Sequence, residues 1–290
     1  MATRNASQAT PPSVPTIGWS TKAVPIFSWT PPASWNRAVA GRCCAGNLRS
    51  GGLMARPAKA MLLAAGLGTR MRPITLNTPK PLVEVAGKAL IDWTLDSLRD
   101  AGVTEVVTNV HHLADQLCAH LSKRARPRVI ISDETAQLLD TGGGVLKALP
   151  LLGTDPFFCC NCDAIVTEAA ASPSVFSRIA DGWDDARHDV LMLVTPTATA
   201  SGYDGLGDFF VETDGTMCRR GDAAGAPYVY TGVSVVHPRV LAVEKPEPFS
   251  INRVWDRALA AGRMQAMIHD GGWYHVGTPD AVTATTALLR

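Results

Sequence analysis

Short apolar runs alternate with stretches of helical periodicity along most of the chain. Residues 59–64 form an apolar run that predicts a buried strand. Residues 89–101 predict a helix, because their apolar side chains recur on one face and Gly102 follows as a stop. The same patterns predict strands at residues 103–110, 128–132, 157–163, 190–195, 209–212, 229–236 and 265–268, and helices at residues 112–121 and 253–261.

This alternation predicts the class of fold. Strands that alternate with helices are joined by right-handed crossovers and form a largely parallel sheet. We therefore expect an α/β fold of the Rossmann-like, doubly wound class, with a mostly parallel, mixed sheet. Ligands of such sheets bind outside the carboxyl ends of the strands. The loop after residue 64 and the strand end at Asp163 are therefore expected to share one cleft.

The composition allows one large folded domain. The chain has 290 residues, 46% of them hydrophobic, and a mean hydropathy of +0.07, which is enough to bury a substantial core. No apolar stretch approaches the roughly 20 residues that cross a bilayer, and no signal sequence opens the chain. We expect a cytoplasmic protein without a membrane partner.

Residues 1–53 differ from the rest of the chain. They are rich in Pro, Ser and Ala, contain five basic residues and no acidic one, and lack periodicity. We interpret them as a disordered or non-native extension and residues 54–290 as the folded domain. An upstream extension with Met54 as the true start, a flexible tail and a transit peptide are the three explanations. Residues 54–290 carry a net charge of −4, five less than the +1 of the whole chain, so no nucleic-acid partner is expected.

A glycine-rich segment directly after the first strand carries the candidate chemistry. Gly66 and Gly68 lack the Cβ atoms that would keep the backbone N–H groups away from phosphate oxygens. Arg70 and Lys80 add positive charge, which would stabilise a leaving pyrophosphate. The Walker loop needs Gly-Lys-Ser/Thr, and the dinucleotide fingerprint needs a third glycine where Met71 stands, so neither motif fits. A plain structural turn is the alternative.

Gly-x-Gly-x-Arg followed by Pro79-Lys80-Pro81 resembles the signature of the sugar-1-phosphate nucleotidyltransferases, and the resemblance covers about residues 58–290. Within that family the segment Leu-Asp-Thr-Gly-Gly-Gly at residues 139–144 is most similar to the N-acetylmuramate α-1-phosphate uridylyltransferases. The mannose-1-phosphate guanylyltransferases, which usually carry Gly-Thr-Ala-Gly there, are near relatives. The resemblance implies a sheet of the nucleotide-diphospho-sugar transferase type. It also implies transfer of a nucleotidyl group from an NTP, with UTP expected, to a sugar 1-phosphate, releasing pyrophosphate and recycling a cell-wall precursor.

The resemblance also implies roles for individual residues. Catalysis is assigned to Arg70, Lys80 and Asp163, and Asp163 would hold Mg²⁺, with Mn²⁺ as the alternative. The family has Asn-Gly-Asp here, and this chain has Cys162 in place of the glycine. A turn-capping Asp is the structural alternative for Asp163. Nucleotide binding is assigned to Ala64, Ala65, Gly66, Gly68, Thr69, Arg70, Lys80, Thr141, Gly142 and Gly143.

Several of these assignments leave alternatives open. The second metal carboxylate of the family falls on His275, whose imidazole suits Mn²⁺ or Zn²⁺ better than Mg²⁺, unless a water intervenes. Asn161 and Asp208 match sugar-phosphate contacts but could serve turns. Thr141 could read a nucleobase edge with the two following glycines, or cap a helix over residues 142–149.

Three functions remain open at this point. Uridylyl transfer to N-acetylmuramate 1-phosphate is the main expectation, and mannose-1-phosphate guanylyltransferase activity is the nearest alternative. The departures at Cys162 and His275 motivate a third, a catalytically silent nucleotide-sensing subunit. The expected partners are an NTP and a sugar 1-phosphate, and the expected state is a monomer or a small homo-oligomer. Cys159, Cys160 and Cys162 are interpreted as buried thiols, because no second ligand cluster could complete a zinc site.

Overall fold

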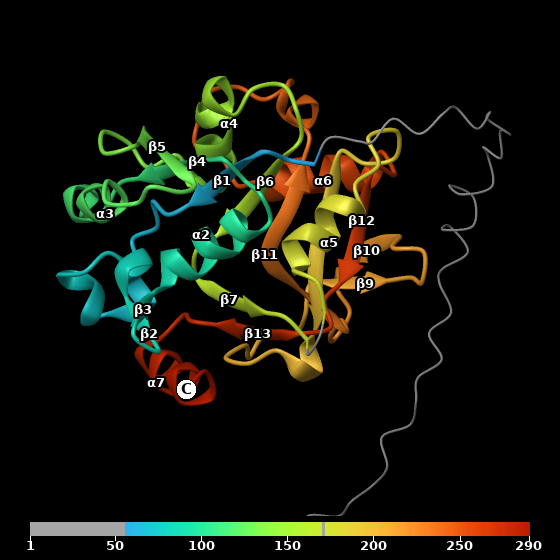
Figure 1. The fold of residues 1–290 in the computed structure, drawn as a ribbon. Coiled ribbons are helices and arrows are strands. Elements are labelled where there is room, and N and C mark those ends of the chain that lie inside the picture. The colour runs from blue at the N-terminus through green and yellow to red at the C-terminus, as the bar shows by residue number, and fades with distance from the viewer. Residues whose placement is uncertain (1–55, 170–171) are drawn as a thin grey trace, which may run out of the picture. The chain divides into compact units, whose positions relative to one another are not determined.

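A nine-stranded mixed sheet forms the centre of the computed structural model, which describes residues 56–169 and 172–290 (Figure 1). One half is the parallel run β6-β1-β4-β5, and the other half is arranged around β11, which is antiparallel to β6, β8 and β9. The strands are β1 (Lys59–Leu63), β4 (Glu105–Val110), β5 (Arg128–Asp133), β6 (Phe157–Asn161), β8 (Val190–Pro196), β9 (Phe209–Val211), β10 (Met217–Arg219), β11 (Tyr228–Val236) and β12 (Met264–Ile268).

Helices cover both faces of this sheet. Side chains alternate along β1, so Ala60 and Leu62 pack into one core cluster and Met61 into the other. The first cluster includes side chains of α2 (Leu90–Asp100), α3 (Ala114–Leu121) and α5 (Val175–Asp181). The second cluster includes side chains of α4 (Asp140–Leu152) and α6 (Asn252–Ala260). The doubly wound, mixed α/β fold is thereby confirmed.

A separate pair of strands lies beside the main sheet and reaches the candidate site. β7 (Ala164–Thr167) follows β6 directly, and β13 (Gly272–His275) pairs with it in antiparallel register. A small hairpin, β2 (Glu84–Val85) and β3 (Lys88–Ala89), packs against α7 (Pro279–Leu288), where Ala86 N donates to Thr286 Oγ1 at 3.2 Å. The hydrophobic pattern did not predict these four strands, nor α5 and α7.

The predicted elements are present, and most of their ends shift by one or two residues. α2 ends at Asp100, one residue before the predicted end, and Gly102 follows with a positive φ of 88° that a side chain would resist. A helix over residues 142–149, which was one of the two alternatives for Thr141, is present and runs from Asp140 to Leu152. Within the described residues, no helix combines the length and apolar character needed to cross a membrane. The interpretation of residues 1–53, including the start at Met54, lies outside the described residues.

Candidate active site

The glycine-rich loop leaves the sheet at the carboxyl end of β1. Gly68 has φ +62°, and a Cβ on it would lie 2.9 Å from Thr75 Cγ2 and 3.1 Å from Lys80 Cβ. A glycine there therefore lets the Lys80 segment pack directly on the loop. A Cβ on Gly66 would meet nothing within 4 Å, so this glycine leaves open space beside the backbone. The two glycines thus serve different purposes, close packing at Gly68 and access at Gly66.

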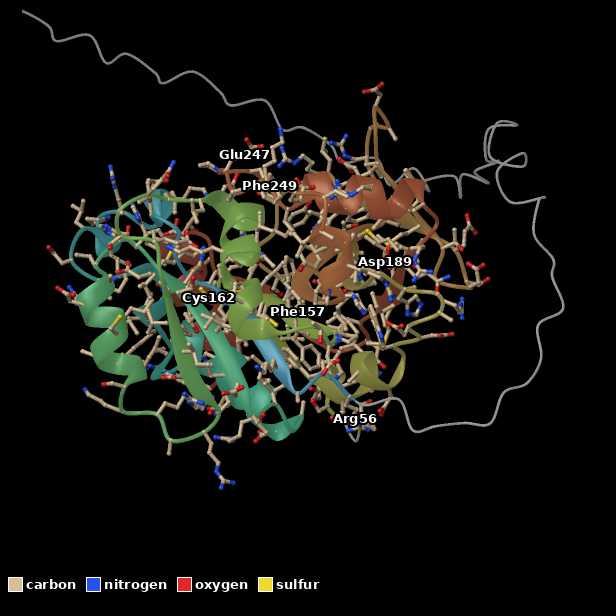
Figure 2. The ribbon with its side chains drawn as sticks, turned by 90° about the horizontal axis from the view of Figure 1, so that it is seen from above. Arg56, Phe157, Cys162, Asp189, Glu247 and Phe249 are labelled. Atoms are coloured by element: carbon tan, nitrogen blue, oxygen red, sulfur yellow. The ribbon has the colours of Figure 1, made fainter. Side chains whose placement is uncertain are left out.

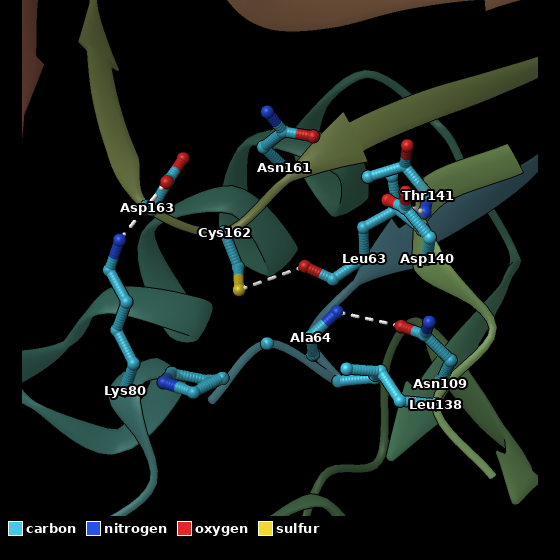
Figure 3. A pocket seen from close by; sticks show the side chains of 13 residues that line it. Leu63, Ala64, Lys80, Asn109, Leu138, Asp140, Thr141, Asn161, Cys162 and Asp163 are labelled. Atoms are coloured by element: carbon cyan, nitrogen blue, oxygen red, sulfur yellow. Dashed lines mark hydrogen bonds and ion pairs between the residues drawn. The ribbon is translucent and has the colours of Figure 1, made fainter. Parts of the chain in front are cut away.

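Lys80 and Asp163 meet although 83 residues separate them. Lys80 Nζ lies 3.0 Å from Asp163 Oδ2, and the two side chains are 13% and 30% exposed (Figure 3). Burial raises the pKa of the Asp163 carboxyl, but the charges of Lys80, His275 and Arg70 outweigh burial and hold the pKa below its ordinary value. Asp163 is therefore an ionised carboxylate at neutral pH, available to a cation.

Strand pairing brings His275 to the same place. The register of β7 and β13 sets His275 opposite Ala164, and Val276 N donates to Asp163 O at 2.9 Å. His275 Nε2 lies 4.0 Å from Asp163 Oδ2. The two positions that the sequence assigned to metal binding therefore lie side by side.

The orientation of the His275 ring is fixed from two sides. Its Nδ1 lies 3.2 Å from Gly202 O, and a carbonyl oxygen can only accept, so Nδ1 carries the proton. Nε2 then faces Asp163, and it is the ring nitrogen that is available to a cation when the imidazole is neutral. The ring stacks on Trp273 at 5.9 Å between centroids and an interplanar angle of 8°. A metal-binding histidine is commonly held in this way by a second partner on its other nitrogen.

Arg70 approaches this cluster from the glycine-rich loop. A Cβ on Gly277 would lie 3.4 Å from Arg70 Nη1 and 2.8 Å from His275 Cε1, so the guanidinium and the imidazole converge on Gly277. Arg70 is exposed, and no described carboxylate pairs with it. Its charge is therefore free to meet a phosphate group.

A cavity of about 250 Å³ lies between the glycine-rich loop and the end of β6 (Figure 3). Seven residues that the sequence assigned to the site line it, namely Ala64, Ala65, Gly66, Lys80, Thr141, Asn161 and Asp163. The other assigned residues do not line it, namely Gly68, Thr69, Arg70, Gly142, Gly143, Asp208 and His275. The predicted meeting of the two distant segments is therefore observed, with Arg70 and His275 beside the cavity.

The start of α4 differs from the helix-cap prediction. Thr141 lies in the first turn instead of capping it, and its Oγ1 accepts a hydrogen bond from Ile251 N at 2.9 Å. The N–H groups of Gly142 and Gly143 both donate to Phe249 O, at 2.8 and 3.2 Å, so neither is free to contact a base. A Cβ on Gly142 would overlap the Phe249 ring. The two glycines therefore serve close packing, and Figure 2 shows Phe249 beside this end of α4.

Asn161 and Asp208 lie in different surroundings. Asn161 ends β6 and lines the cavity, and Gly232, with φ +89°, leaves room for it on β11. A Cβ on Gly232 would lie 3.0 Å from Asn161 Cβ. Asp208 precedes β9, and its Oδ2 accepts from Tyr230 N at 3.0 Å. The structure thus places Asn161 at the cavity and holds Asp208 on the backbone of β11.

Cys162 occupies the position where the family pattern has glycine. Its side chain packs into the core cluster with α2 and α5, and its Sγ lies 3.1 Å from Leu63 O. Burial raises the pKa of the Cys162 thiol to about 12, so it stays protonated at neutral pH. Cys159 is buried in the same strand, and burial raises its thiol pKa to about 12 as well. The interpretation of these cysteines as buried thiols is confirmed.

Six residues of the cavity wall were not assigned to the site from the sequence. They are Leu63, Pro81, Asn109 near the end of β4, Leu138, Asp140 at the start of α4, and Cys162. Asn109 had a recognisable signal, because it is a polar residue near the carboxyl end of a predicted strand, where ligands of such sheets bind. Asp140 has φ +59°, which is uncommon for a residue with a side chain and frequent at functional sites.

The residues present fit a divalent cation that is shared with a substrate. No group of three or more His, Cys, Asp and Glu side chains that could enclose a metal occurs within residues 56–169 and 172–290. Mg²⁺ commonly takes one or two carboxylates and completes its shell with phosphate oxygens and waters. Asp163 with His275 Nε2 supplies such a partial set of ligands.

The fold and this site define a nucleotidyltransferase that binds a nucleoside triphosphate. The chain belongs to the family of the MobA-like NTP transferase domain, whose model matches residues 60–273. It is 45% identical to the N-acetylmuramate alpha-1-phosphate uridylyltransferase of Caulobacter vibrioides over 237 residues, which cover 80% of this chain and 97% of that protein. It is 34% identical to the protein of the same name from Neisseria meningitidis serogroup B, over 79% of this chain and 97% of that protein.

More distant relatives agree with this assignment. The mannose-1-phosphate guanylyltransferase catalytic subunit beta of Dictyostelium discoideum is 32% identical, over 76% of this chain and 61% of that protein. Among solved structures, an apo UDP-glucose pyrophosphorylase superposes with a TM-score of 0.66 at 16% identity, covering 80% of this chain and 98% of that chain. This last likeness shows the fold alone, and it confirms the nucleotide-diphospho-sugar transferase type of sheet.

Proposed function

We propose that this protein transfers a uridylyl group from UTP to N-acetylmuramate α-1-phosphate and releases pyrophosphate. The observation that carries the proposal is the Lys80–Asp163 pair, which faces the glycine-rich loop across one cavity. The name of the two uridylyltransferase relatives supports the choice of base and sugar, because both align over nearly their whole length. The product would be a nucleotide sugar for recycling of a cell-wall precursor.

The chemistry needs positioning and charge neutralisation more than covalent catalysis. A phosphate oxygen of the sugar 1-phosphate attacks the α-phosphorus of UTP, and the bond to the β-phosphate oxygen breaks as pyrophosphate leaves. Lys80 and Arg70 carry positive charge beside the cavity, where negative charge grows on the leaving group. Ala64, Ala65 and Gly66 line the cavity, and this segment would hold the nucleotide against the sheet, with the open space beside Gly66 giving access to the backbone. No enzyme-bound intermediate is required.

Asp163 and His275 would hold the divalent cation, with Mg²⁺ expected and Mn²⁺ as the alternative. The cation would supply charge neutralisation at the phosphates when it is bound. The imidazole favours Mn²⁺ relative to a site made of carboxylates alone. Asn161 offers an amide at the rim of the cavity to the sugar phosphate. Asp208 would contribute from the neighbouring strands around β11.

A matrix of substrates tests the proposal. The purified protein is incubated with each of UTP, GTP, CTP and ATP against N-acetylmuramate, N-acetylglucosamine, glucose and mannose 1-phosphates, with Mg²⁺ or Mn²⁺, and pyrophosphate release is measured. The expected maximum is UTP with N-acetylmuramate 1-phosphate. A maximum at GTP with mannose 1-phosphate would instead assign the guanylyltransferase activity. Nucleotide-induced thermal stabilisation without pyrophosphate in every combination would favour a silent sensor.

The remaining expectations accompany this proposal. We assign the activity to residues 54–290 and expect the extension at residues 1–53 to be dispensable for it. The substrates are small and anionic, so neither a nucleic acid nor a membrane is needed as a partner. We expect a monomer or a small homo-oligomer that acts in the cytoplasm, where UTP is available.

A further inference from the structure

Glu134 is a buried carboxylate that the chemistry above does not use. It lies between β5 and α4, and the residue is 1% exposed. Within the described part of the chain it forms no ion pair with a Lys, Arg or His side chain. Burying a carboxylate costs free energy unless its oxygens are hydrogen-bonded, so the contacts of Glu134 need an explanation.

Those contacts connect two walls of the cavity. Ala64 N donates to Asn109 Oδ1 at 2.7 Å, as Figure 3 shows. Asn109 Nδ2 donates to Glu134 Oε1 at 2.9 Å, and Leu139 N donates to Glu134 Oε2 at 3.2 Å. The chain of hydrogen bonds therefore runs from the glycine-rich loop, through two side chains, to the segment that begins α4. Ala64, Asn109 and the neighbours of Leu139 all line the cavity.

The directions of these hydrogen bonds restrict which side chains can occupy positions 109 and 134. Both ends of the chain, Ala64 N and Leu139 N, are backbone groups that can only donate. The side chain next to Ala64 must accept on one atom and donate on the other, as Asn109 does. The side chain next to Leu139 must then accept on both atoms, and among side chains of this length only a carboxylate does so. This requirement explains why a charged Glu134 is buried here.

Packing leaves the chain of hydrogen bonds no room to shift. A Cβ on Gly144 would lie 2.8 Å from Glu134 Oε1 and 2.9 Å from Asn109 Nδ2, so α4 presses directly on it. The backbone of Glu134 is also held, because its N donates to Val110 O at 2.9 Å and its O accepts from Gln137 N at 3.0 Å. A change of hydrogen-bond pattern at Glu134 must therefore move the cavity wall.

We infer that Glu134, acting through Asn109, is a positioning residue that fixes the nucleoside side of the cavity and thereby sets the affinity for the NTP. The inference rests on the proposed function, because it takes the cavity to bind a nucleoside triphosphate. Glu134 itself does not line the cavity, so its effect passes through Asn109 and the segment before α4. Sugar 1-phosphate binding, which involves other residues, should be little affected.

Two isosteric substitutions test the inference. Glu134→Gln introduces an NH₂ group that must face another donor, either Leu139 N or Asn109 Nδ2. If the Asn109 amide flips so that its oxygen accepts from the Gln NH₂ group, its own NH₂ group then faces the donor Ala64 N. We expect the Kd for UTP, measured by calorimetry without a sugar phosphate, to rise by about tenfold or more. The KM for the sugar phosphate and kcat at saturating UTP should change by less than about threefold.

The double variant Asn109→Asp/Glu134→Gln restores every hydrogen bond. Asp would accept from Ala64 N and from the Gln amide, and the Gln oxygen would accept from Leu139 N, at the same net charge. We expect it to recover most of the UTP affinity, whereas Asn109→Asp alone would set two carboxylates against each other. Glu105→Gln, at a partly exposed ion pair on β4, is the matched control and should leave the Kd unchanged.

The outcomes of these measurements distinguish failure of the proposed function from failure of the inference about Glu134. Wild-type protein that binds no UTP would refute the proposed function. Wild-type protein that binds UTP while Glu134→Gln binds it equally well would refute only the inference. If the single variant fails to fold, the double variant decides, since a folded double variant with weak UTP binding would overturn the inference and one with recovered binding would support it.

Discussion

The two walls of the cavity are built on different principles. The phosphate wall, defined here by Gly66, Lys80 and Asp163, carries charged side chains that face each other 3.0 Å apart. The nucleoside wall, defined here by Asn109, Glu134 and residues 138–142, lines the cavity with Asn109, Leu138, Asp140 and Thr141 and is held by buried hydrogen bonds. Under the proposed function, the first wall would supply the electrostatics of the reaction and the second would supply the shape of the cavity.

This difference predicts how substitutions on each wall change activity, nucleotide affinity and stability. A charge that stabilises a transition state affects kcat, whereas a wall that only shapes the cavity affects nucleotide affinity and stability. Substitutions on the phosphate wall should therefore lower turnover in a protein that remains folded. Substitutions on the nucleoside wall should weaken binding or unfold the end of α4.

The largest effect is expected for Lys80→Ala. It removes the cation nearest to Asp163, and the loss of one preorganised charge of this kind lowers kcat by about 100-fold to 1,000-fold. Asp163→Ala should lower kcat by a similar factor, because it removes the proposed carboxylate ligand of the cation. Pyrophosphate release at saturating substrates measures both. Lys88→Ala, which breaks a surface pair with Asp96, is the control and should keep wild-type turnover. Near-normal turnover of Lys80→Ala would remove the phosphate wall from the mechanism.

A smaller effect on the same wall is expected for His275→Asp. The substitution replaces an imidazole beside Asp163 by a carboxylate, and hard oxygen ligands favour Mg²⁺. The ratio of kcat/KM with Mn²⁺ to that with Mg²⁺ should fall by about tenfold relative to the wild type. His275→Gln, which keeps a polar side chain of similar size, should lower activity with both cations. An unchanged ratio in His275→Asp would show that His275 does not bind the metal.

The two walls also differ in how far the sequence predicted them. The phosphate wall was predicted because Gly66, Gly68 and Lys80 lie within 15 residues, and because Asp163 ends a strand that is recognisably apolar. The carboxyl ends of parallel strands meet at one edge, so the contact of Lys80 with Asp163 followed from topology. The phosphate wall was therefore predictable from a motif of short range in the sequence and from the alternation of strands with helices.

The nucleoside wall depends on contacts that no local pattern encodes. The hydrogen bond between Asn109 and Glu134 joins residues 25 positions apart, and Phe249 reaches Gly142 from 107 positions away. β7 and β13 were missed because each has only four residues and a mixture of buried and half-buried positions. Long-range packing decides such elements, so their pattern could not be recognised beforehand.

On the nucleoside wall, Gly142→Ala should cost about 1–3 kcal/mol of unfolding free energy, because overpacking of this size forces neighbours to move. The added Cβ would overlap the Phe249 ring, which packs against the first turn of α4. Urea denaturation gives the free energy, and adding Phe249→Leu should return part of it. Gly182→Ala, where the nearest atoms are 3.5 Å away, is the matched control and should stay close to the wild type. Equal stability of both variants would contradict the packing described here.

The smallest effect is expected behind the nucleoside wall, at Glu244. This side chain is 4% exposed and pairs with Arg257 and with Arg253, whose guanidinium lies 4.2 Å from the centre of the Phe249 ring. Burial raises the pKa of the Glu244 carboxyl, but the two arginines outweigh it and hold the pKa below its ordinary value. A lowered pKa contributes stability that is present above the pKa of the unfolded chain and is lost as pH falls through the folded pKa.

Glu244→Gln should therefore lower the Tm by a few degrees at pH 7, where the carboxylate is ionised. The difference from the wild type should shrink as the pH falls below the ordinary carboxyl pKa of about 4.3 and then through the lower pKa that Glu244 has in the folded state. Thermal unfolding followed by circular dichroism from pH 7 to pH 3 measures it, with the exposed Glu84→Gln as control. A difference that stays constant over this range would mean that Glu244 supports Phe249 by its shape, so that the nucleoside wall would owe nothing to charge at this position.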